Sequence, residues 1–326
     1  MSPEFQEPGR GGNVLTVIGE SLIDRIQSKT RALVADHVGG SPLNVAVGSA
    51  RLGVPTRFVT HIGEDEYGEL ISSHLGDNGV EVVTGGTAPT STATATLGPD
   101  GSASYEFALD WDLSSASLTA WANIETSTHL HTGSIATMLM PGARTVHALL
   151  ADARETATIS YDPNCRPTII QDVDFARRQA ELFVGISDIV KASDEDMIWL
   201  YPDMSVEAAM QYWLEQGPSL VIVTRGADGP IALTRQARVE LPADRITVAD
   251  TVGAGDSFMA ALIAALDQLD LLAPSNRREL LALDHERLQV ILHYAIKASG
   301  ITCSRAGANP PHLSELGTAP SVTTAP

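Results

Sequence analysis

Short apolar runs of the kind found in strands alternate with stretches of helical periodicity along most of this chain. A strand followed by a covering helix returns to the same sheet in parallel, so the alternation predicts a mainly parallel sheet with helices on both faces. We therefore expect a three-layer α/β domain. Its strands are predicted at Val14–Ile18, Arg57–Ile62, Thr128–His131, Ala157–Tyr161, Ile186–Val190 and Leu220–Thr224.

Two polar, β-prone segments depart from this rhythm, at about 22–38 and 91–109. The second has alternating residues on each side of Gly98-Pro99-Asp100-Gly101, which is typical of a hairpin. We expect both segments to form a small β-sheet that projects from the main domain as a lid. Residues 1–13 are predicted to be a flexible tail, 14–313 the domain and 314–326 a polar tail.

The chain is strongly acidic, with 21 basic and 40 acidic residues among 326 and a net charge of −19. Such a charge opposes binding to nucleic acids and to anionic membrane surfaces. A phosphate-bearing ligand must then be held locally, by helix N-termini, backbone N–H groups or metal ions. No apolar run approaches the roughly 18 residues of a membrane span, and no signal peptide is evident, so a cytoplasmic location is expected.

Cysteine and histidine spacing gives no metal site. Cys165 and Cys303 lie far apart without CxxC spacing, so both are predicted to be free thiols. His129 and His131 share one face of a predicted strand, but no third ligand is evident. We therefore predict no zinc.

A glycine-rich turn feeds an apolar helix in Asp250-Thr251-Val252-Gly253-Ala254-Gly255-Asp256-Ser257-Phe258. Gly253 and Gly255 allow successive N–H groups at the helix start to converge on an anion. Asp256, in the first helical turn, could accept a proton from an attacking hydroxyl group. Taken alone, the pattern fits equally well a tight turn with a helix-start carboxylate.

A second string lies about two hundred residues earlier, in Gly39-Gly40-Ser41-Pro42-Leu43-Asn44-Val45-Ala46 and then Arg51-Leu52-Gly53. Gly39 and Gly40 permit close approach of the backbone to a ligand. Asn44 can offer both a donor and an acceptor to sugar hydroxyl groups, although helix capping also explains an asparagine there.

Together these two strings resemble the two signatures of the PfkB, or ribokinase-like, carbohydrate kinases, and the resemblance extends from Val14 to Pro311. It is nearest to the fructokinase-like branch. The resemblance implies a ribokinase-like fold and ATP-dependent phosphorylation of a sugar hydroxyl. It also implies that Asp256 is the general base, that Gly253, Ala254 and Gly255 form an anion hole, and that a lid-mediated homodimer can form.

On the sugar side, the resemblance implies that Asp24, Gly39, Gly40 and Asn44 bind substrate. Asp24 ends the string Gly19-Glu20-Ser21-Leu22-Ile23-Asp24, where a solvated turn carboxylate is the alternative. The strings His131-Thr132-Gly133-Ser134 and Asp162-Pro163-Asn164-Cys165-Arg166-Pro167 resemble strand ends of the fructokinase-like and ketodeoxygluconate-kinase-like branches. Arg166 is thus a further candidate for contact with phosphate or substrate, with a structural salt bridge as the alternative.

On the nucleotide side, Thr224-Arg225-Gly226-Ala227-Asp228-Gly229 resembles the family's nucleotide loop, although a plain hairpin would also suit it. The cofactor-binding residues implied are Lys191, Ser193, Thr224, Gly226 and Gly229. The family's Asn-x-x-Glu motif for hydrated Mg²⁺ is replaced by Ser193-Asp194-Glu195-Asp196, so Asp196 would act through water, while helix capping by Ser193 can coexist with that role. Asp250 and Cys303–Gly307 resemble a monovalent-cation site, which would hold K⁺.

Three other classes remain as alternatives to an active sugar kinase of this family. A catalytically silent homologue is disfavoured by retention of Asp256 and both glycines. A nicotinamide-dependent oxidoreductase is disfavoured because this chain has Gly19-Glu20-Ser21 and no G-x-G-x-x-G after its first strand. A P-loop kinase is disfavoured because no G-x-x-x-x-G-K-[ST] is present.

The substrate candidates are fructose, 2-keto-3-deoxygluconate and a nucleoside. No lysine or arginine lies between Arg57 and Arg144, which includes the second lid segment. A covered carboxylate needs a cation or several donors, so a neutral ketohexose such as fructose is favoured.

Overall fold

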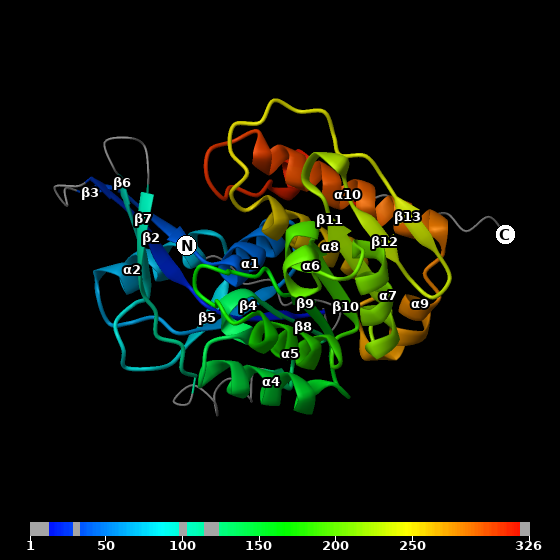
Figure 1. Cartoon of the computed structure of the whole chain (residues 1–326), viewed down its shortest axis with the longest axis horizontal. Helices are drawn as coiled ribbons and strands as arrows, with labels where there is room; N and C mark the ends of the chain where they lie inside the picture. Colours follow the sequence, from blue (N-terminus) through cyan, green and yellow to red (C-terminus); the bar gives the residue numbers. More distant parts are fainter. Residues whose placement is uncertain (1–12, 29–32, 98–102, 114–123, 320–326) are drawn as a thin grey trace, which may run out of the picture.

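The structure is a computed structural model that describes residues 13–28, 33–97, 103–113 and 124–319. It has three layers, with a large twisted sheet between two sets of helices and a smaller sheet projecting to one side (Figure 1). The three-layer architecture and the separate small sheet confirm the fold expected from the sequence.

Within the described residues the large sheet has nine strands, in the order β13-β12-β11-β10-β9-β8-β1-β4-β5. The pairings β11–β12 and β12–β13 are antiparallel and the others are parallel. The interior parallel strands are buried along nearly their whole length, whereas the edge strand β5 is partly exposed. The strands are β1 (Leu15–Ile18), β4 (Thr56–Thr60), β5 (Glu81–Thr84), β8 (His129–Gly133), β9 (Thr158–Asp162), β10 (Ile189–Ser193), β11 (Leu220–Thr224), β12 (Ile231–Leu233) and β13 (Arg238–Glu240).

Helices cover both faces of this sheet and divide the core into two clusters. One face packs against α1 (Ser41–Arg51), α2 (Glu66–Asp77), α8 (Ala254–Gln268), α9 (Arg277–Leu281), α10 (His285–Cys303) and α11 (Leu313–Leu316). The other face packs against η1 (Ser134–Thr137), α4 (Gly142–Ala153), α5 (Val173–Val184), α6 (Asp194–Leu200) and α7 (Val206–Gln216). Short 3₁₀ turns lie at η2 (Gly226–Asp228) and η3 (Pro274–Asn276).

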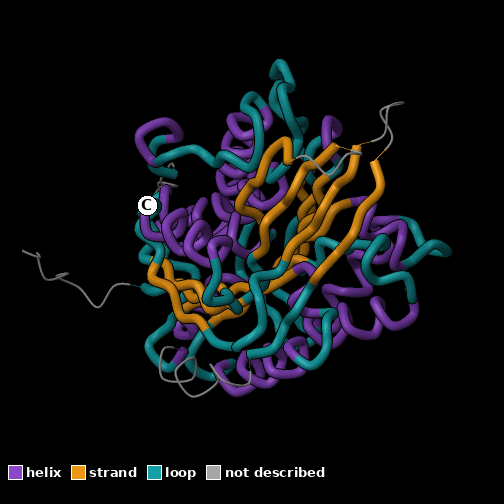
Figure 2. The backbone as a smooth tube through the Cα atoms, turned by 90° about the vertical axis from the view of Figure 1, so that its left-hand side faces the viewer, coloured by secondary structure: helices purple, strands orange, loops and turns teal. Residues whose placement is uncertain are grey.

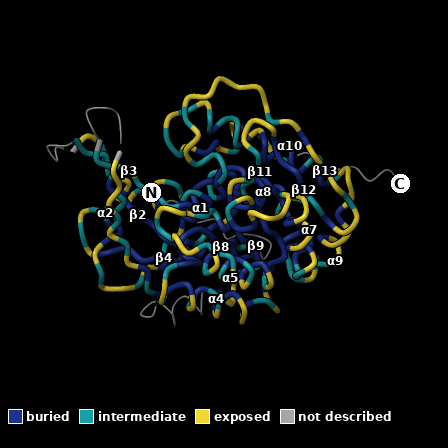
Figure 3. Tube along the Cα trace, viewed as in Figure 1, coloured by how far each residue is buried: buried dark blue, intermediate teal, exposed yellow. Residues whose placement is uncertain are grey.

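Helix α8 is the central helix of the first face, because every residue from Phe258 to Leu266 is buried. A helix that is apolar on all sides must be covered on all sides. Helices α1 and α10 both pack against it, and Figure 3 shows it in the buried interior. The packing of α8 therefore fixes its N-terminus near the carboxyl ends of the parallel strands β9 and β10.

The small sheet has the order β3-β2-β6-β7 and is built from β2 (Leu22–Ser28), β3 (Leu33–Gly39), β6 (Thr92–Leu97) and β7 (Ala103–Ala108). Its strands come from the two segments that departed from the α/β rhythm. The expected turn at Gly98–Gly101 lies outside the described residues. Figure 2 views the molecule from the side of this sheet, which we call the lid.

Several expected boundaries differ from the structure, two of them by at least three residues. Strand β10 begins three residues after the predicted Ile186, because Ser187 still closes the turn after α5 and the Asp188 carboxylate accepts the N–H of Ile159 at 2.8 Å. At the C-terminal end, packed structure continues beyond residue 313, since Leu316 is buried and the Tyr294 hydroxyl donates to the Gly317 carbonyl. No helix in the described ranges is long and apolar enough to cross a membrane.

Candidate active site

The first turn of α8 forms one wall of the candidate site. Gly253 caps the helix in a left-handed conformation, with φ of 74°, where a side chain would be strained. An added β-carbon at Gly253 would also lie 2.6 Å from that of Ala308. The Ala254 N–H donates to the Thr251 carbonyl at 3.2 Å, whereas the other N–H groups of this first turn remain available for an anion, as at other helix N-termini.

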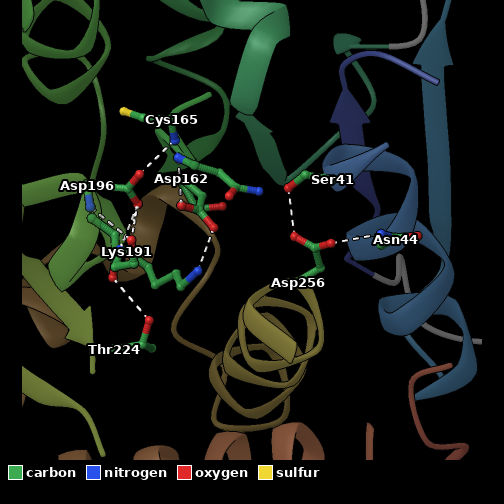
Figure 4. Close-up of polar contacts among 12 residues, drawn as sticks. Ser41, Asn44, Asp162, Cys165, Lys191, Asp196, Thr224 and Asp256 are labelled. Carbon is green, nitrogen blue, oxygen red and sulfur yellow. Dashed lines mark hydrogen bonds and ion pairs between the residues drawn. The ribbon is translucent and has the colours of Figure 1, made fainter. Parts of the chain in front are cut away.

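Asp256 lies in this first turn and is held by two donors from α1 (Figure 4). The Ser41 hydroxyl donates to one carboxylate oxygen at 2.7 Å, and the Asn44 amide donates to the other at 2.8 Å. Only 7% of Asp256 is exposed. The two signature strings, distant in sequence, thus meet at one carboxylate, which is fixed in place and still has lone pairs for a further hydroxyl donor.

A buried ion pair lies on the other side of the α8 N-terminus (Figure 4). The Lys191 ammonium is 2.7 Å from the Asp162 carboxylate, and the two side chains come from neighbouring strands, β10 and β9. Burial raises the pKa of Asp162 to about 6, although Lys191 lowers it. Burial opposes the charged form of Lys191, but Asp162 outweighs it and the pKa of the ammonium is raised. Both groups are therefore charged at neutral pH.

Asp196 lies in the first turn of α6 beside this pair, and both of its carboxylate oxygens already accept hydrogen bonds. One oxygen accepts the N–H of Cys165 at 2.7 Å, and the other accepts both the N–H and the hydroxyl of Ser193 at 2.8 and 2.7 Å. The capping box expected as an alternative for Ser193 is present. These bonds leave room for a water molecule but not for direct, multidentate metal coordination, so the residues fit a hydrated Mg²⁺ carried by nucleotide phosphates.

The expected sugar-binding residues gather where the lid meets the main sheet. Gly39 lies against Asp24, since an added β-carbon would be 2.3 Å from a carboxylate oxygen. Gly40 has φ of 119°, and its β-carbon would lie 2.6 Å from the Glu20 carbonyl. The close approach made possible by these glycines is therefore to the protein's own side chain and backbone.

Glu20 is a buried carboxyl group in this region that sequence reasoning left without a role. It accepts the N–H of Ala136 at 3.1 Å, and burial raises its pKa to about 7. Burial also raises the pKa of Asp24, and the Arg166 charge lowers the pKa of both carboxyl groups. The Arg166 guanidinium itself donates to the Asn164 side chain at 2.6 Å and is exposed, and it contacts neither carboxylate directly.

The expected nucleotide loop follows β11 and folds around Arg225. The guanidinium donates to the Gly229 carbonyl at 3.0 Å and pairs with Glu240 at 2.8 Å. Gly226 and Gly229 both have positive φ, and a β-carbon at Gly229 would lie 2.1 Å from the Leu241 carbonyl. Thr224 is paired with Ser193 on β10, so these two candidate nucleotide ligands stand side by side.

Comparison with known proteins supplies the family. The model of the pfkB family carbohydrate kinases matches residues 14–315. A fructokinase from Rhizobium leguminosarum bv. trifolii is 34% identical and covers 83% of this chain and 84% of its own length. Fructokinase-1 of Oryza sativa subsp. japonica is 32% identical over 90% of this chain and 92% of its own. This chain belongs to the pfkB family.

A solved structure agrees with that assignment. The fructokinase with bound ATP from Xylella fastidiosa superposes with a TM-score of 0.81 at 26% identity, covering 93% of this chain and 96% of the other. The chain is therefore an ATP-dependent carbohydrate kinase of the pfkB family.

Two residues of this pfkB site were present in the quoted sequence strings without a role. Ser41 was part of the glycine-glycine signature, and Asp162 began the Asp-Pro-Asn string. For Asp162, the available signal was Lys191, because a lysine within a predicted buried strand requires a carboxylate partner. For Ser41, the signal was its position beside Asn44, one turn away on the same helix.

The His129 and His131 side chains serve the interior of the sheet. Ser160 links them, with its hydroxyl 2.9 Å from a ring nitrogen of each, and Thr158 contacts His129 at 2.8 Å. Burial lowers the pKa of both imidazoles to about 3, so they are neutral. Among the described residues, no group of three or more His, Cys, Asp or Glu is arranged to hold a metal ion.

Proposed function

We propose that this kinase transfers the γ-phosphoryl group of ATP to a hydroxyl group of fructose, with Asp256 as the general base. The observation that carries the proposal is the position of Asp256, buried in the first turn of α8 immediately after Gly253 and Gly255. A carboxylate beside a helix N-terminus places a proton acceptor and an anion-binding site next to each other.

In the proposed reaction, the hydroxyl proton passes to Asp256 as the sugar oxygen attacks phosphorus in line. The bond between phosphorus and the ADP oxygen breaks at the same time. Ser41 and Asn44 keep the carboxylate oriented, and the N–H groups of the Gly253–Gly255 turn would donate hydrogen bonds to the phosphoryl oxygens. Hydrated Mg²⁺, held through water near Asp196, would neutralise charge on the phosphates.

The nucleotide would lie along Thr224–Gly229, with Lys191 and Ser193 next to it. Support comes from the neighbouring positions of Ser193 and Thr224, at the carboxyl ends of parallel strands. Ligands of open α/β sheets bind outside those ends. The same edge carries the start of α8, so a nucleotide there has its γ-phosphate within reach of the turn.

A monovalent cation, K⁺, would lie beside Asp250, whose carboxylate joins two loops. One oxygen accepts the N–H of Val252 at 3.1 Å and the other accepts that of Gly307 at 2.8 Å. The Cys303 carbonyl accepts the N–H of Ala249 at 2.8 Å. In the proposal, carbonyl oxygens of these fixed loops would coordinate the cation while Asp250 would supply negative charge.

Fructose is favoured over a sugar acid by the charges that face the substrate. Strands β6 and β7 contain no lysine or arginine. Arg166 forms no ion pair with a carboxylate among the described residues, but its charge acts on both Glu20 and Asp24. A substrate carboxylate would therefore compete with Glu20 and Asp24 for the charge of Arg166, and desolvating it would be costly.

The lid also offers a surface for a homodimer. Tyr105 is 63% exposed and stacks on Phe107, 6.2 Å between ring centroids. Both rings lie on the face of the lid that carries Asp24, according to the strand register. Sedimentation should show a dimer in the native protein, and Tyr105→Asp should shift it toward monomer; a monomeric native protein would contradict this.

The substrate proposal is tested by kcat/KM for fructose, ribose, 2-keto-3-deoxygluconate and adenosine at one Mg²⁺ and K⁺ concentration. We expect fructose to be preferred at least tenfold, about 1.4 kcal/mol in transition-state binding. A tenfold preference for the sugar acid would overturn the charge argument. No ATP consumption with any compound would instead favour a silent homologue.

A further inference from the structure

Lysine is scarce in this chain, which has only Lys29, Lys191 and Lys297. Lys191 is unusual because its ammonium is buried, with 4% of the residue exposed. Buried lysines are rare unless they are paired, and Asp162 provides the pair at 2.7 Å. The position of this charge is therefore imposed by the fold.

The ammonium lies directly against the start of α8. A β-carbon added to Gly255 would be 3.0 Å from the ammonium nitrogen. Gly255 is inside the helix and does not have positive φ, so its lack of a side chain matters here for space. The glycine leaves room for the Lys191 ammonium beside the turn that would bind the phosphoryl group.

Two donors of the ammonium remain for a ligand. An ammonium has three N–H donors, and within the described ranges Asp162 is its one hydrogen-bond partner. Asp196 and Asp256 also lie close enough to favour its charged form. On the other side of the turn, Asp256 points toward Ser41 and Asn44 (Figure 4). The turn is therefore flanked by a cation on one side and a base on the other.

We propose that Lys191 is a further catalytic residue, whose ammonium donates hydrogen bonds to the oxygens of the phosphoryl group as it moves from ADP to the sugar, and that Asp162 is its positioning residue. This inference rests on the proposed kinase function. No proton leaves the ammonium, since the hydroxyl proton goes to Asp256 and the broken phosphorus–oxygen bond leaves its electron pair on ADP. A fixed cation at developing negative charge lowers the barrier most when it is already oriented.

A purely structural ion pair is the competing explanation, and removing one partner of a buried pair can destabilise a protein by itself. We therefore pair Lys191→Met with the double variant Lys191→Met/Asp162→Asn, which removes the cation without leaving a buried charge. Lys297→Met is the matched control, because Lys297 lies on α10 and donates to the Leu316 carbonyl at 3.0 Å. Steady-state kinetics with ATP and fructose and calorimetry with ADP provide the readouts.

We expect kcat to fall at least about 10²-fold in both Lys191 variants while the Kd for ADP stays within about threefold. Lys297→Met should retain native kcat. Near-native turnover in the double variant would overturn the proposal, because the loss in Lys191→Met would then come from the unpaired Asp162.

A second readout separates failure of this inference from failure of the kinase function. Aluminium fluoride with ADP imitates the transferring phosphoryl group, so it should tighten ADP binding by the native protein and not by the double variant. This comparison needs no turnover. An equal fluoride-dependent gain in ADP affinity in both proteins would show that Lys191 does not contact the phosphoryl group, whether or not any sugar is phosphorylated.

Discussion

At the scale of single residues, Glu20 carries the clearest pH signal. Its pKa is about 7 in the folded protein, raised by burial from 4.5. Above pH 7 the ionised group is less favourable in the folded chain than in the unfolded chain, so it lowers the free energy of unfolding. Below about pH 4.5 it is neutral in both states and the penalty disappears.

We therefore predict that Glu20→Gln raises the free energy of unfolding by about 1–3 kcal/mol at pH 8.5, with little change at pH 4.5. The glutamine can still accept the N–H of Ala136. Urea unfolding at both pH values measures the effect, with the exposed Glu64→Gln as the control. A gain that is equal at the two pH values would contradict the assigned titration.

At the scale of elements, the start of α8 depends on space beside Gly255. Gly255→Ala should lower kcat at least about tenfold while ADP affinity stays within a few-fold, because the added β-carbon would press on the Lys191 ammonium. The free energy of unfolding should change little, because the preference of about 1 kcal/mol for alanine over glycine within a helix offsets the cost of that contact. Gly76→Ala in α2, where a β-carbon meets nothing within 4 Å, is the control. Native turnover in Gly255→Ala would show that the ammonium can move without cost.

The elements themselves could largely be predicted from sequence, because apolar periodicity specifies which segments are buried. The prediction was wrong by three residues at β10, where Ser187 and Asp188 make side-chain and turn contacts that periodicity does not report. For the site, the sequence predicted only the two signature strings, Gly39–Gly53 and Asp250–Phe258, and not the contacts between them. The hydrogen bonds from Ser41 and Asn44 to Asp256, and the pairing of Asp162 with Lys191, depend on which elements the fold brings together.

At the scale of the whole molecule, the lid and the main sheet are expected to close on the sugar. Saturating fructose should slow hydrogen exchange of amides in β6 and β7 more than ATP does, because closure would order the lid over the substrate. Mass spectrometry of peptides from Thr92–Leu97 and Ala103–Ala108 measures this. Identical exchange with and without fructose would mean that the lid does not respond to substrate.

The most direct test of the whole account is the turnover of Asp256→Asn. An asparagine keeps the size of the side chain and can still pair with Ser41 and Asn44, because the serine hydroxyl can accept as well as donate. Asp267→Asn, near the other end of α8, is the matched control, and its bond from Asn13 can persist. We predict that kcat of Asp256→Asn falls by about 10²-fold to 10⁴-fold while ATP and fructose bind within a few-fold of native affinity. A kcat close to that of the native enzyme would contradict the assignment of Asp256 as the general base.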